Sequence, residues 1–220
     1  MGDSLQKKVE ENVYDILFEL ENELGIETEK LPEVYYVNKF SEFENLGLNL
    51  EIKPFFNKII EDNSALCLME EKIILTTEID ELVLGEEVGH YIHYNYLNLK
   101  DKRGINQFSF EALSEMLGFF SSKLISSERE NPYSSRIDSF PKNSKNLNEI
   151  IKKIYDVTQN EEEYFDEIHS QGYSMGEKLF NYYTSDLILK QKVKEIFTNP
   201  LDSESEAFYQ FLHWKYEILK

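Results

Sequence analysis

The sequence predicts an α+β fold in which a small sheet and its helices form the first half and helices alone form the second. Two short apolar runs, residues 65–69 and 72–76, are separated by two glutamates and predict a β-hairpin. From residue 108 onward, apolar side chains recur with helical spacing, and no strand pattern follows. The 220 residues are enough for one large domain or two small ones.

The N-terminal part is expected to begin with a long helix over residues 4–24. Its apolar side chains recur at helical spacing, Ser4 is a suitable N-cap, and Gly25 follows the last apolar position. A short strand is expected over residues 33–37, and a weaker strand candidate lies at residues 55–60. Together with the hairpin, these strands would form a small mixed sheet.

Two helices are expected after the hairpin. The first runs from Thr77, which can cap it, to about residue 99, and acidic side chains lie in its first turn, where the helix dipole favours them. A turn at residues 100–104 separates this helix from a second one over residues 108–125.

The second half follows a polar segment at residues 126–145 that is rich in Ser, Asn and Pro. We interpret this segment as a linker or flap between an α+β subdomain at residues 1–125 and a helical subdomain at residues 146–220 that packs on the first. Three or four helices are expected in the second half, over residues 147–157, 161–169 or beyond, 175–197 and 203–220.

The composition excludes several classes of partner. The chain carries 42 acidic and 23 basic side chains, so its formal net charge is −19 and its pI is about 4.6. Such a chain repels phosphate backbones and anionic membranes, so neither nucleic acid nor a membrane is expected as a partner. No apolar run approaches a membrane span, the N-terminus is too polar for a signal peptide, and the single Cys67 cannot form an internal disulfide. We therefore expect a cytoplasmic location.

The residues that carry chemistry lie in the stretch Gly-Glu-Glu-Val-Gly-His-Tyr-Ile-His-Tyr at residues 85–94. On a helix, Glu86 and His90 are four residues apart and share one face, His93 lies near that face, and Glu87 lies beside it. A metal ion held by the first pair would have a carboxylate next to it that can accept a proton from water. Such a cluster in a helix core also needs compensation, because a buried charge is costly unless it is paired or ligated.

This stretch resembles the His-Glu-x-x-His signature of zincin metallopeptidases, with Glu86 in place of the first His. The next helix is similar to the third-ligand helix of the gluzincin branch, because Glu111 lies 21 residues after His90 and Glu115 lies one turn later. The resemblance covers residues 65–125. It implies a zincin-like fold and a metal-dependent peptidase that acts on peptide or protein substrates. It assigns Glu86, His90 and Glu111 as ligands of a divalent metal, zinc in this family, and the next residue, Glu87, as the general base.

The Glu at the first ligand position changes the chemistry that the motif predicts. A set of Glu, His and Glu is harder and more anionic than the usual two His and one Glu, so it would favour oxygen-preferring metals. His93 could serve as a ligand in place of Glu86 after a change of register. In the second half, Tyr173 or His169 could stabilise the developing oxyanion, a task that a Tyr or His performs in zincins.

Two other interpretations use the same residues. A zincin-like fold retained as a non-catalytic binding or regulatory module would explain the missing first His. A ferritin-like di-iron bundle would use the Glu-x-x-His pattern at residues 87–90, the Asp-x-x-His pattern at residues 166–169, and Glu19 and Glu115 as lone carboxylates. The strands expected between residues 33 and 76 argue against a plain bundle.

Overall fold

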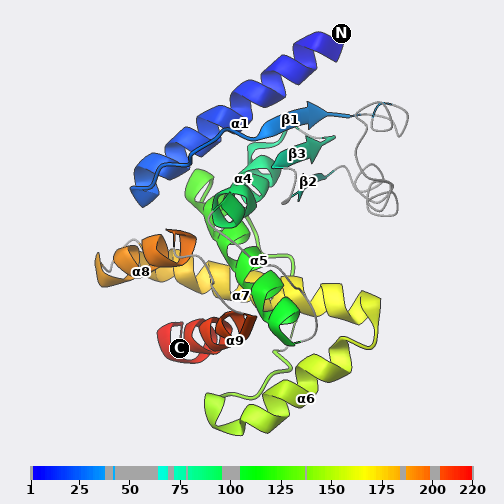
Figure 1. The fold of residues 1–220 in the computed structure, drawn as a ribbon, viewed down its shortest axis with the longest axis vertical. Helices are drawn as coiled ribbons and strands as arrows, with labels where there is room; N and C mark the ends of the chain where they lie inside the picture. The colour runs from blue at the N-terminus through cyan, green and yellow to red at the C-terminus, as the bar shows by residue number, and fades with distance from the viewer. Residues whose placement is uncertain are drawn as a thin grey trace.

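In the computed structural model, a small sheet and one long helix lie at one end of the molecule, and the remaining helices extend towards the other end (Figure 1). The structure describes residues 2–37, 42, 64–68, 72–77, 79–95, 105–136, 138–183, 187–198 and 204–219. This part of the chain is mixed α+β, as the sequence predicts. The strand candidate at residues 55–60 and the turn at residues 100–104 lie outside the described residues.

The sheet has the order β1-β3-β2, with β1 at Glu33–Tyr36, β2 at Ala65–Leu68 and β3 at Ile73–Thr76. β2 pairs antiparallel with β3, and Leu66 lies opposite Leu75, which confirms the expected hairpin. β1 runs parallel to β3 on its other side. All residues of β3 are buried because it is the central strand of the three.

The first helix, α1 at Gly2–Leu24, packs along the sheet and covers the outer edge of β1. Gln6 donates from Nε2 to the Val34 carbonyl oxygen at 2.6 Å and accepts at Oε1 from the Tyr36 backbone N–H at 2.8 Å. These bonds satisfy backbone groups that would otherwise be unpaired at a sheet edge. Gly25 follows α1 with φ of 63°, the left-handed conformation in which helices commonly end.

The helix that carries the His-containing motif, α4 at Glu81–Asn95, begins later than the sequence predicts. Asp80 caps it, because Asp80 Oδ1 accepts from the Leu82 backbone N–H at 2.8 Å. Thr77, the expected cap, instead donates its hydroxyl to the Ser64 carbonyl oxygen at 3.1 Å beside the sheet. Hydrogen bonding to the sheet therefore displaces the helix start.

The next helix, α5 at Ile105–Ile125, lies between α4 and the helices of the second half (Figure 1). Its side chains are buried on almost every face from Phe108 to Lys123. A helix in contact with neighbours all round is expected to be apolar all round, which explains why α5 has no broad polar face.

The second half of the chain is helical, as the sequence predicts. The expected final helix is confirmed and its last turn is π-helical. The elements are η2 (Ser144–Asn146, a 3₁₀ turn), α6 (Leu147–Val157), α7 (Glu161–Tyr183), α8 (Leu187–Thr198), α9 (Glu204–His213) and η3 (Trp214–Ile218, π-helical). None of the described helices combines the length and hydrophobicity that a membrane crossing requires.

One continuous helix, α7, replaces the two that the sequence predicts around residues 169–175. The helix expected from residue 161 continues to Tyr183, and the expected helix over residues 175–197 is divided between α7 and α8. Gly172 lies inside α7 where it approaches α5: a Cβ there would lie 3.0 Å from the Ala112 carbonyl oxygen and would overlap the Glu115 Cβ. Gly172 therefore permits close helix packing and does not end a helix.

A single apolar core joins the first and second halves of the chain. Fully or almost fully buried side chains from α1, α4, α5 and the C-terminal helices belong to one contiguous cluster. Representative members of this cluster are Leu17, Val88, Phe120, Leu179, Phe211 and Leu219. The packing of α5 against both α4 and α7 therefore positions side chains from distant parts of the sequence next to one another.

Replacing Gly172 with alanine is expected to push α7 away from α5. The new Cβ would meet backbone atoms of α5 at 3.0 Å, and backbone atoms cannot rotate away as the tip of a side chain can. We expect the free energy of unfolding to fall by about 1–3 kcal/mol, the usual cost of overpacking. Urea denaturation measures this change, with Ser174→Ala at an exposed position of the same helix as the matched control. Equal stabilities of the two variants would contradict the packing argument.

His93 lies in the core between α4 and α5, where it is 1% exposed and stacks on Phe110 with 5.5 Å between the ring centroids. Burial, assisted by the neighbouring His90, lowers the pKa of His93 from 6.5 to about 3. Below pH 6.5 the unfolded chain protonates this imidazole while the folded chain keeps it neutral. The stability that His93 contributes is therefore present above pH 6.5 and is lost as the pH falls towards 3.

Replacing His93 with phenylalanine should remove this pH-dependent loss and keep an aromatic ring against Phe110. As the pH falls from 7 to 5, we expect the parent protein to lose about 2 kcal/mol of unfolding free energy through His93, and we expect the variant to keep it. Chemical denaturation of both proteins at the two pH values measures the difference. A difference that does not change with pH would show that His93 titrates alike in the folded and unfolded chain.

Candidate metal centre

Glycines allow α4 and α5 to pack at very short distance. A Cβ at Gly89 of α4 would lie 2.6 Å from Ser121 Oγ, and a Cβ at Gly118 of α5 would lie 2.6 Å from the His90 ring. The imidazole of His90 therefore lies directly over the backbone of α5. A side chain at either glycine would separate the two helices or displace the ring.

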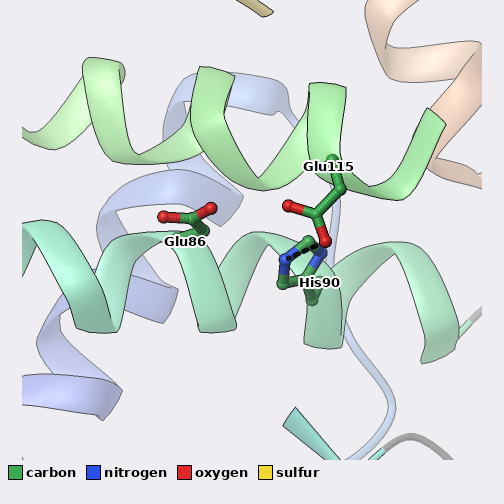
Figure 2. A group of neighbouring side chains, drawn as sticks. All are labelled: Glu86, His90 and Glu115. Carbon is green, nitrogen blue, oxygen red and sulfur yellow. Dashed lines mark ion pairs between the residues drawn. The ribbon is translucent and has the colours of Figure 1, made fainter. Parts of the chain in front are cut away.

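Three potential metal ligands converge between these two helices. Glu86 and His90 of α4 and Glu115 of α5 each offer one donor atom, and these atoms lie within 4.8 Å of one another. Figure 2 shows the Glu86 carboxylate one turn from His90 along α4 and the Glu115 carboxylate reaching towards His90 from α5. His90 Nε2 lies 3.8 Å from Glu115 Oε1, and the three side chains are only 10–18% exposed. We refer to these three residues as the acid–imidazole group.

The orientation of His90 is set by α5. Its Nδ1 lies 2.8 Å from Ser114 Oγ, so Nε2 is the ring nitrogen that faces Glu115. A hydrogen bond to the second nitrogen of an imidazole is the usual way in which a metal-binding histidine is oriented. Burial, with smaller contributions from His169 and Arg129, lowers the pKa of His90 to about 3, so the ring is neutral near pH 7 and able to act as a ligand.

A second imidazole faces the same carboxylate from α7. His169 Nε2 lies 3.7 Å from Glu115 Oε2, on the opposite oxygen from His90. His169 Nδ1 lies 2.7 Å from the Phe165 carbonyl oxygen, which can only accept a hydrogen bond, so Nδ1 carries a proton. In the neutral ring, Nε2 then directs a lone pair at the carboxylate. Such a contact between two acceptors is stabilised by a proton or a cation between them.

Glu86 is held at both of its oxygens. Tyr173 of α7 donates its hydroxyl to Glu86 Oε1, and Arg129 donates from Nη2 to Glu86 Oε2 in an ion pair. Arg129 follows α5 in the segment that the sequence predicts to be a linker or flap. Tyr133 of the same segment stacks on His169 with 6.2 Å between ring centroids. This segment therefore packs directly over the residues beside the acid–imidazole group.

Glu87, the predicted general base, points to the sheet. Its Oε2 accepts from the Cys67 backbone N–H of β2 at 2.6 Å. Burial raises the pKa of Glu87 well above its ordinary value, and the charges of Glu86 and Glu115 raise it further, while the Cys67 N–H and Arg129 oppose the shift. The carboxyl therefore holds its proton more tightly than an exposed glutamate, and its catalytic role stays a prediction.

Glu111, the predicted third ligand, lies one turn from Glu115 on α5 and outside the acid–imidazole group. Its Oε1 accepts from Gln107 Nε2 at 2.8 Å. Its charge adds to burial in raising the pKa of Tyr164. The register of the helix pair thus brings Glu115, 25 residues after His90, next to Glu86 and His90, and the role of Glu111 as a ligand stays a prediction.

The electrostatics of the group favour an added cation. Burial raises the pKa of Glu115 well above its ordinary value, and the charges of Glu86 and Glu111 act in the same direction against the opposing Arg129. Burial and the same acidic neighbours also raise the pKa of Tyr173. Burial is the main cause of both pKa shifts, and the buried carboxyls, which outnumber the cations near them among the described residues, add to it.

The residues of the di-iron alternative do not gather at one point. Glu19 of α1 lines a surface hollow of about 460 Å³ with Leu124 of α5, nine residues from Glu115 along that helix. Asp166 pairs with Arg136 at 3.2 Å and is largely exposed. His90 and His169 do both face Glu115, so this pattern shares His90 and Glu115 with the acid–imidazole group and has His169 beside it.

Sequence reasoning missed Arg129 and gave Glu115 only a secondary place. The chain contains three arginines, and two of them, Arg129 and Arg136, lie in the polar segment at residues 126–145. Their concentration in one segment of an acidic chain is a signal that could have been used, because arginine is the preferred partner of buried carboxylates. The sequence pattern alone does not show which carboxylate each of these two arginines pairs with.

The chain matches no family model, no curated protein and no solved structure. The resemblance to zincins is therefore carried by the motif residues alone. What the candidate site can do follows from its own geometry: two carboxylates and an imidazole buried at one point, a second imidazole beside them, and one arginine paired with the first carboxylate.

Proposed function

We propose that this protein is a metal-dependent hydrolase of zincin-like type that binds a divalent metal ion through Glu86, His90 and Glu115. The observation that carries the proposal is the convergence of these three donor atoms within 4.8 Å of one another at a largely buried point between α4 and α5. Ionised carboxylates at such a point require a compensating cation.

The donor chemistry fits a divalent metal. Two carboxylate oxygens and one imidazole nitrogen form a mixed set of the kind that Zn²⁺, Mn²⁺ and Fe²⁺ accept. The donors are also oriented from outside the group, His90 by Ser114 and Glu86 by Tyr173, as ligands in metal sites usually are. Both features support a metal site over a chance contact of acidic side chains.

A metal at this point would polarise a substrate carbonyl and make water more acidic, which is the chemistry that peptide hydrolysis needs. The motif assigns Glu87 to accept and release the proton, and its raised pKa makes the ionised carboxylate a stronger proton acceptor than that of an exposed glutamate. Tyr173 would keep Glu86 in position, and His169 would stabilise the developing oxyanion from α7 in its protonated form, in which Nε2 can donate a hydrogen bond. Peptides or proteins are the substrate class that the motif suggests.

A second candidate is a non-catalytic metal-binding or regulatory module with the same ligands. One observation favours it: Arg129 already forms an ion pair with Glu86, so part of the negative charge of the group is neutralised within the chain. Both candidates require metal binding, and a hydrolysis assay separates them.

Metal binding is expected to depend on Glu115 and not on Glu111. In isothermal titration calorimetry with Zn²⁺ and with Mn²⁺, Glu115→Gln and His90→Ala should each weaken binding by more than about tenfold, because each removes a donor atom. Glu111→Gln is the matched control, since it removes the same charge one turn away on the same helix, and it should bind almost as the parent protein does.

Two outcomes would contradict this ligand set. The first is that the parent protein binds neither ion. The second is that Glu111→Gln weakens binding as much as Glu115→Gln, which would return the role of third ligand to Glu111. Circular dichroism of each variant should accompany the titrations, so that lost affinity is not confused with lost structure.

Hydrolysis is expected to depend on Glu87. With metal bound, Glu87→Gln should lower the cleavage rate of a fluorogenic peptide library by about 10²–10⁴-fold and leave metal affinity unchanged, because it removes a proton acceptor and no ligand. Glutamine retains an oxygen that can accept the Cys67 N–H, so the contact with β2 is preserved. Undiminished cleavage by the variant would exclude Glu87 as the base. Metal binding without cleavage by the parent protein would favour the non-catalytic module.

A further inference from the structure

Arg129 is an interior cation fixed against the acid–imidazole group. Its side chain is 14% exposed, and it donates from Nη1 to the Leu82 carbonyl oxygen at 2.7 Å and from Nη2 to Glu86. The guanidinium also lies 5.4 Å from the ring centroid of Phe119 and 5.9 Å from that of Tyr173. These contacts hold the guanidinium of Arg129 next to Glu86, so its positive charge acts directly on the acid–imidazole group.

The pair of Arg129 and Glu86 changes the net charge of the proposed donor set. Two carboxylates and a neutral imidazole carry two negative charges, and the guanidinium reduces this total to one. Two imidazoles and one carboxylate, the set that zincins use, also carry one negative charge. Arg129 therefore offsets the extra charge that Glu86 brings in place of a histidine.

The position of Arg129 allows it to act on a bound ion without replacing it. Leu82 lies one helical turn before Glu86 on α4, whereas His90 lies one turn after it. Arg129 binds Leu82 and Glu86, so it lies on the side of Glu86 away from His90. The space shared by the donor atoms of Glu86, His90 and Glu115 is on the other side of that carboxylate.

We propose that Arg129 determines the cation specificity of this site: by neutralising Glu86, it limits the affinity of the group for all cations, and for highly charged cations most. This inference rests on the proposed metal site. Repulsion between the guanidinium and a bound ion grows in proportion to the charge of the ion. Arg129 therefore favours divalent over trivalent ions at a carboxylate-rich site that would otherwise attract trivalent ions strongly.

The test is the affinity of Arg129→Gln for Mn²⁺ and for Tb³⁺, measured by calorimetry and by tyrosine-sensitised terbium luminescence. If loss of the charge strengthens Mn²⁺ binding about tenfold, proportional scaling predicts about a thirtyfold gain for Tb³⁺. Arg129→Met is a second neutral variant that keeps aliphatic contact with Phe119 and Tyr173, and it should show the same gains. Circular dichroism establishes that each variant is folded.

Two controls isolate the charge of Arg129. Arg129→Lys keeps the charge and should retain the selectivity of the parent protein between the two ions. Arg136→Gln removes the other arginine of the same segment, which pairs with Asp166 and Glu167 and not with the group, and it should leave both affinities unchanged.

The outcomes for Arg129 and for the metal site are distinguishable. One outcome is that the parent protein binds Mn²⁺ through His90 and Glu115, but the neutral Arg129 variants bind neither ion more tightly than the parent does. This outcome would exclude the specificity role of Arg129 and leave the metal site in place. An equal gain for Mn²⁺ and Tb³⁺, or the same gain in Arg129→Lys or Arg136→Gln, would also exclude it. If the parent protein and the neutral Arg129 variants bind no cation, both proposals are wrong.

Discussion

The close approach of three helices is the constraint on which the candidate site depends. Because Gly118 has no side chain, the His90 ring lies against α5, and because Gly172 has none, α7 lies against Glu115. A carboxylate on α5 is thereby enclosed between imidazoles from α4 and α7. Side chains at these glycines would separate the donor atoms without altering any of them, so backbone packing determines the chemistry available here.

Electrostatic cost explains why the group is held by so many partners. Glu86 has both oxygens engaged, by Arg129 and Tyr173, and the pKa values of Glu87 and Glu115 are raised by burial and by their acidic neighbours. The interior thus supports one carboxylate paired with an arginine and resists further negative charge. A divalent cation would stabilise the ionised forms that burial disfavours, so cation binding and carboxyl ionisation are linked at this point.

Sequence patterns predict the elements whose formation depends on neighbouring residues. They do not predict contacts between segments that are far apart in the chain. The hairpin and α6 follow from local patterns, and four-residue spacing alone places Glu86 and His90 on one face of α4. Which residue of α5 lies near His90 depends on the register of the two helices, and the structure places Glu115 there and Glu111 one turn away. A single arginine in an irregular segment has no periodicity, so its pairing with Glu86 becomes visible only in three dimensions.

Glu87 connects the helix motif to the sheet and limits how the site could act. Among the described strands β2 pairs with β3 alone, and the Cys67 N–H that Glu87 binds points away from β3 towards α4. Because one N–H makes one strong hydrogen bond, this donor is fully used by Glu87. Loss of that bond would remove a contact that lowers the pKa of Glu87, leaving the carboxyl a stronger base. The basicity of Glu87 is therefore tied to the one hydrogen bond that it makes with β2.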